Sequence, residues 1–173
     1  PLPPSTSEAT SRSLARVYLG MALLPQGKVD EASREFEQAI VLRPDLDRAY
    51  ALLAEAQLAQ RKPRAALASL EQALTRRPAE PALLKRMAWV LAMTSDDTVR
   101  NGARAVQYAE YAVTLTGGRD PVALDVLAVA YAEVGQFDKA KAAIGRAAEL
   151  IRSGGPDDLI AMLRGHLALF EAK

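Results

Sequence analysis

The sequence predicts an all-α fold made of repeated antiparallel helix hairpins, and three observations support this. Half of the residues are hydrophobic while only 5% are aromatic, so the apolar content is mainly Ala and Leu. Ala favours helices and lets their backbones approach closely, whereas a sheet would need more β-branched and aromatic residues. The apolar residues also follow helical spacing, and their pattern recurs after 34 residues.

The recurring pattern places small residues where two helices of a hairpin touch and large residues beside them. The first copy, from Ser13, contains Leu19, Gly20, Leu23, Ala32, Phe36, Ala39 and Pro44. The second copy, from Asp47, contains Leu53, Ala54, Gln57, Ala66, Leu70, Ala73 and Pro78. A later copy, from Pro121, contains Leu127, Ala128, Tyr131, Gly135, Ala140, Ile144 and Ala147.

Residues that end or begin helices occur at the boundaries of these copies. Gly27 and Gly135 stand where a first helix ends, and glycine tolerates the left-handed cap. Pro44 and Pro78 end second helices. Asp120 is predicted to cap a helix that begins at Pro121.

The third copy departs from the pattern. It begins at Pro81, and its second helix carries Ala105, Ala109 and Ala112 five residues later than expected. We expect the insertion around residues 94–99, with Asp96 or Asp97 capping a second helix lengthened at its start. The turn at residues 117–118, Gly-Gly, replaces the usual Pro.

A last amphipathic helix follows the break at residues 153–156 and would cover the apolar face of the final hairpin. Its apolar residues are Leu159, Met162, Leu163, Leu167 and Phe170. The helices are expected at 7–25, 29–43, 46–60, 63–76, 80–93, 98–116, 120–134, 137–152 and 156–171.

From about residue 13 to 152 the chain resembles the tetratricopeptide repeat (TPR) family, in a bacterial-type variant. The resemblance implies a right-handed superhelical solenoid of hairpins. Residues 1–6 are interpreted as the remnant of a linker, because the opening is rich in Pro and Ser and lacks Met. Residues 7–173 would form one TPR domain, with repeats at 13–46, 47–80, 81–120 and 121–154 and a capping helix at 156–171.

The composition excludes several classes of function. The chain has no Cys and a single His, at position 166, which excludes disulfides, thiolate sites and multi-His metal sites within one chain. A net charge of +1 argues against a nucleic-acid binder. There is no glycine-rich phosphate loop, and His166 has no carboxylate arranged near it, so it is interpreted as an ordinary histidine of the capping helix. We therefore expect no enzyme activity, no cofactor and no metal.

No run of 18 apolar residues predicts a membrane span, and the opening lacks a signal peptide. The sequence leaves the compartment open between cytoplasm and periplasm.

The resemblance implies a concave groove lined by the first helix of each hairpin. The residues at its lining positions are Val17, Met21, Arg48, Ala51, Glu55, Lys85, Trp89, Val122, Asp125 and Val129. TPR domains that bind chaperone tails carry Lys and Asn where this chain has Val17, Met21 and Leu52, so that specificity is not expected. Trp89 would either contact a ligand or fill space beside the inserted turn, and Lys85 would either bind a peptide carboxylate or stay solvated.

The leading hypothesis is a noncatalytic scaffold that binds a peptide or protein segment in this groove. One alternative is a structural module that can form homo-oligomers. The other is a regulatory appendage of a larger enzyme, such as a glycosyltransferase, whose catalytic domain lies outside this chain.

Overall fold

The computed structural model describes residues 6–152 and 156–171, and this part of the chain is all-α without a strand. The chain divides into two compact units, one ending at Pro78 and the other starting at Ala79. Residues 1–5 of the expected linker and the expected break at 153–155 lie outside the described residues. Thr6, the last residue of that linker, already belongs to the first helix.

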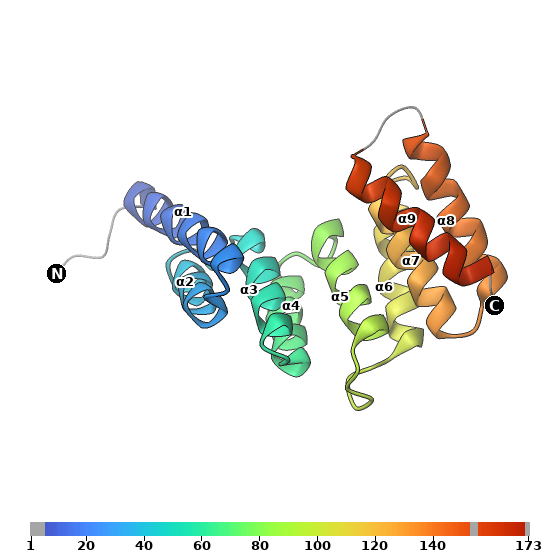
Figure 1. Ribbon diagram of the computed structural model, residues 1–173. Coiled ribbons are helices and arrows are strands. Elements are labelled where there is room, and N and C mark those ends of the chain that lie inside the picture. The colour runs from blue at the N-terminus through green and yellow to red at the C-terminus, as the bar shows by residue number, and fades with distance from the viewer. Residues whose placement is uncertain (1–5, 153–155, 172–173) are drawn as a thin grey trace. The chain divides into compact units, whose positions relative to one another are not determined.

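Both units consist of helix hairpins, and each hairpin closely matches one predicted from the repeat (Figure 1). The first unit contains α1 (Thr6–Leu23), a 3₁₀ turn η1 (Leu24–Gln26), α2 (Val29–Leu42), α3 (Asp47–Ala59) and α4 (Pro63–Arg76). The second contains α5 (Pro81–Met93), α6 (Gly102–Leu115), α7 (Pro121–Glu133), α8 (Phe137–Ile151) and α9 (Asp157–Glu171).

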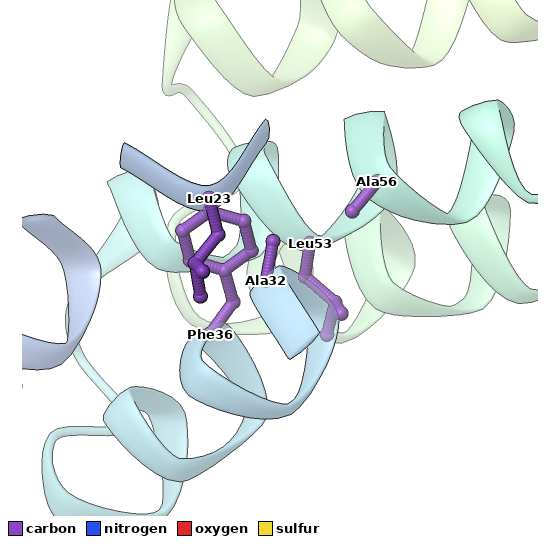
Figure 2. Close-up of a cluster of buried hydrophobic side chains, with 5 residues drawn as sticks. All are labelled: Leu23, Ala32, Phe36, Leu53 and Ala56. Atoms are coloured by element: carbon purple, nitrogen blue, oxygen red, sulfur yellow. The ribbon is translucent and has the colours of Figure 1, made fainter. Parts of the chain in front are cut away.

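In the first unit α2 packs between α1 and α3. Figure 2 shows Phe36 and Ala32 of α2 clustered with Leu23 from α1 and with Leu53 and Ala56 from α3. Phe36 is fully buried, and burying such a side chain contributes about 1.5–3 kcal/mol. One face of α2 thus joins two successive hairpins.

The second unit has its most buried helix in α7, whose residues 123–130 are all buried. It packs against α5, α6 and α8, and more lightly against α9. In Figure 1 the C-terminal helix α9 lies beside α8 and crosses α7, as expected of a helix that covers the last hairpin. The side chain of Phe170, predicted to join this contact, lies outside the described part.

Glycine marks two predicted helix ends, and arginine adopts a left-handed conformation at a third, where the sequence did not predict one. Gly27 and Gly135 both have φ of 74°, which confirms the left-handed caps. Arg61 stands 34 residues after Gly27 and has φ of 59°. The repeat therefore imposes a left-handed residue at this place even though Arg adopts that conformation at a cost.

The start of α6 differs from the prediction. The helix begins at Gly102, not at 98, and its N-cap is Asn101, whose Oδ1 accepts from the Arg104 N–H at 3.0 Å. Asp96 instead caps the preceding turn, accepting from the Thr98 N–H at 3.0 Å. The Asn101 N–H donates to the Leu91 carbonyl, so the inserted segment is bonded back to α5 before α6 can start. By contrast, Asp120 caps α7 as predicted.

Two glycines inside helices provide a test of the packing. A Cβ at Gly20 would lie 2.5 Å from Cε1 of Phe36, whereas one at Gly145 would meet nothing within 4 Å. We expect Gly20→Ala to lower the free energy of unfolding by about 1–3 kcal/mol. Gly145→Ala should raise it by about 0.5–1 kcal/mol, because Ala loses less backbone entropy in a helix. Urea unfolding followed by circular dichroism measures both, and equal effects of the two changes would contradict the α1–α2 contact.

The left-handed Arg61 gives a second test. Arg61→Gly should raise the free energy of unfolding by about 0.5–1 kcal/mol, since glycine removes the steric cost of positive φ. Gly27→Ala at the equivalent position should lower the free energy of unfolding by a similar amount, about 1 kcal/mol. A Cβ at Gly27 would clash with no atom, so the loss would come from the positive φ alone. Thermal unfolding of both variants measures the pair. A loss of stability in Arg61→Gly would refute the assigned turn.

Candidate functional site

In the first unit, the predicted groove residues have very different exposures. Val17 is only 1% exposed and packs with Ala39 and Ala49, so its prediction as a ligand-facing residue is wrong. Met21 and Ala51 are half-buried, while Arg48 and Glu55 are exposed.

Arg48 joins α3 to α1 across this surface. Its guanidinium lies 3.2 Å from Sδ of Met21 and 6.0 Å from the centre of the Tyr18 ring. A cation at that distance from an aromatic face is attracted to it. The exposed side chains at the predicted lining positions of this unit are those of Arg48 and Glu55, whereas Met21 and Ala51 are half-buried.

The second unit brings four of the five predicted residues to one pocket of about 370 Å³. Lys85 and Trp89 come from α5, and Val122 and Asp125 come from α7. The pocket is also lined by Ala82, Arg86, Val126 and Met162. Val129, the fifth predicted residue, is 6% exposed and belongs to the core of α7 rather than to an open surface. The contribution of α9 through Met162 was not anticipated by the repeat pattern.

Lys85 is part of the architecture of the pocket. Its ammonium donates to Oδ2 of Asp120 at 2.5 Å, and Oδ1 of the same carboxylate accepts from the N–H groups of Val122 and Ala123. Although burial by itself raises the pKa of Asp120, the hydrogen bond and charge of Lys85 hold this pKa below its ordinary value. The pair therefore ties α5 to the start of α7.

Asp125 and His166 form a pair that sequence reasoning missed. Asp125 is 1% exposed, and its Oδ1 lies 2.6 Å from Nδ1 of His166 on α9. The expectation that His166 has no carboxylate near it is therefore wrong. The hydrogen bond to Asp125 raises the pKa of His166, against the lowering effect of burial. The available signal was an acid inside the otherwise apolar run 123–130, because a buried carboxylate requires a partner.

Trp89 lies beside this pair. The centres of its ring and of the His166 imidazole are 6.3 Å apart, with the planes tilted by 37°. The indole is half-buried, so it contacts α9 and still lines the pocket.

Over residues 6–152 and 156–171, no cluster of three or more His, Asp and Glu side chains could hold a metal ion. No helix in that part of the chain combines the length and apolar character that crossing a bilayer requires.

The Asp125–His166 pair predicts a dependence of stability on pH. The pKa of His166 is raised in the folded chain, so its stabilising contribution is fully present below the unfolded-state pKa of about 6.5. That contribution is lost as the pH rises through the folded-state pKa. We expect the difference in unfolding free energy between wild type and His166→Gln to shrink between pH 5.5 and 9 (roughly the range around that value).

The chain has one His, so nuclear magnetic resonance can follow its imidazole directly. Its titration midpoint should lie above the ordinary value and should fall in Asp125→Asn. A stability difference independent of pH, with an ordinary midpoint, would rule out the pair.

Comparison with known families and structures identifies the fold. The tetratricopeptide repeat model matches residues 47–80 and 123–153. No curated protein sequence matches this chain. The solved structure of TTC0263, a thermophilic TPR protein of Thermus thermophilus, superposes with a TM-score of 0.66 at 22% identity, covering 93% of this chain and 92% of that one.

Two further structures show the same likeness. MamA from Desulfovibrio magneticus RS-1 gives a TM-score of 0.66 at 16% identity, over 93% of this chain and 94% of that one. A chain of the APC/C hetero-tetramer Cut9–Hcn1 gives 0.77 at 16% identity, over 95% of this chain and 32% of that one. At these identities the likeness establishes the fold. Two segments of the chain thus match the tetratricopeptide repeat model, and the chain shares the all-α fold of TPR proteins.

Proposed function

We propose that this protein is a noncatalytic scaffold that binds a peptide or protein segment on the inner faces of its first helices. The TPR fold is typical of protein–protein interaction scaffolds, and the pocket of the second unit supports a specific contact. It gathers an indole, aliphatic side chains and a thioether from three helices, which is the chemistry of an apolar anchor site.

The charges around this pocket are largely used within the protein. Lys85 is bonded to Asp120, and Asp125 is bonded to His166. A ligand that needed either charge would have to break an existing pair. We therefore expect an apolar side chain of the ligand to supply most of the affinity, with Val122 and Met162, each 37% exposed, among its contacts.

The first unit supports a second, more polar contact region. Arg48 and Glu55 are exposed on α3, and the half-buried Met21 and Ala51 lie at lining positions of α1 and α3. An extended or helical segment with apolar anchors and a few charges suits this surface.

The test uses peptides selected from a display library on the whole protein, with the single Trp as reporter. A peptide in the pocket should change the fluorescence of Trp89. Val122→Asp should weaken its binding by about tenfold or more, because a charge replaces an apolar contact. Val134→Asp is the matched control, since Val134 is also 37% exposed but does not line the pocket; it should leave affinity unchanged.

Either of two results would count against the proposal. Selected peptides that bind without changing Trp89 fluorescence, or that bind Val122→Asp as tightly as wild type, would place the contact elsewhere. Circular dichroism of both variants shows that they are folded before affinity is compared.

A further inference from the structure

A stripe of side chains on α1 is exposed although its repeat equivalents are covered. Tyr18 is 59% exposed and Leu19 is 49% exposed, and Ala15 and Ala22 beside them are exposed as well. The spacing of these four residues places them on one face of α1. We call this set, Ala15, Tyr18, Leu19 and Ala22, the α1 stripe.

The 34-residue repeat identifies the equivalent face on α3. Its residues are Ala49, Leu52, Leu53 and Ala56, of which Ala49 and Ala56 are fully buried and Leu53 is 5% exposed. Leu53 and Ala56 cluster with Ala32 and Phe36 of α2, and Ala49 clusters with Ala39 of α2. The face that α2 covers on α3 has no such cover on α1 among the described residues.

A polar contact at the end of the same face repeats this difference. Gln60, just after α3, donates from Nε2 to Oδ1 of Asp30 at 2.7 Å and to Oγ of Ser33 at 3.0 Å, both on α2. Its equivalent is Gln26, the last residue of the turn η1, which is exposed and donates to the Ala22 carbonyl of α1 instead of to a neighbouring helix. The α1 stripe and the amide of Gln26 are thus arranged like the residues with which α3 and Gln60 bind α2.

We propose that the α1 stripe binds an amphipathic helix of another protein that presents the apolar face of α2. Such a helix carries a small, a large and a small residue in the places of Ala32, Phe36 and Ala39. It also carries an acceptor near its start, in the place of Asp30, for the amide of Gln26. This contact continues the α2–α3 interface by one helix, and it uses a surface separate from the pocket of the second unit.

The test uses a probe peptide with the sequence of residues 28–43, stapled between the exposed positions 34 and 38 so that it is helical. Fluorescence anisotropy measures its binding to the whole protein. We expect saturable binding that Leu19→Lys weakens by about tenfold or more, because Lys replaces a central apolar contact. Val41→Lys, at a residue that is 80% exposed on α2 and outside the stripe, is the control and should bind the probe as wild type does.

Two further measurements make the assignment specific. A probe with Phe36→Lys should lose binding, and Gln26→Ala should weaken binding of the unchanged probe by several-fold, because it removes the amide that donates to the Asp30 carboxylate. A probe that binds Leu19→Lys as well as wild type, or that does not bind at all, would overturn the proposal. Sedimentation velocity tests whether a second copy of this chain occupies the stripe instead. A wild-type dimer that Leu19→Lys dissociates would show that it does, and would overturn the proposal of a partner helix.

Discussion

The contact between a second helix and the first helix that follows it is the interaction on which the described architecture depends. In the first unit a single face of α2 meets both α1 and α3, with Phe36 fully buried between Leu23 and Leu53. Small residues such as Ala32 and Gly20 allow these helices to approach, and close packing makes this contact intolerant of added volume. Each hairpin is therefore incomplete until a neighbour covers it, which is the logic of repeat proteins.

The C-terminal end of the chain meets this requirement with α9, and the same helix shapes the pocket. His166 reaches the buried carboxylate of Asp125, and Met162 supplies part of the lining beside Trp89. An isolated buried carboxylate would be costly, so the pair fixes where α9 lies along α7. The helix that covers the last hairpin, α9, consequently also builds part of the candidate site.

Most of the fold could be predicted because each repeat carries residues that mark where its helices begin and end. Gly27 ends a helix and Asp120 caps one through their own backbone or side chain, so the sequence alone reveals these boundaries. Arg61 could not be read in this way, since the packing of its hairpin overrides the preference of the residue. The start of α6 was placed too early because the segment before it offers several N-cap residues, and only the bond of Asn101 back to α5 selects among them.

The candidate site was partly predictable for the same reason. The register placed Lys85 and Trp89 on one face of α5, where both line the pocket, but it could not reveal that Val17 and Val129 are buried. Asp125 and His166 are 41 residues apart, and their contact depends on how α9 docks, which has no counterpart in the repeat.

Side-chain footprinting of the whole protein with a carbene reagent tests the central claim most directly, because it reports which equivalent faces are covered. Tyr18 and Leu19 of α1 should be modified much more than their repeat equivalents Leu52 and Leu53 of α3, which α2 covers. Equal modification of the two pairs would contradict the claim that the covering helix, rather than the repeat position, determines what each face does.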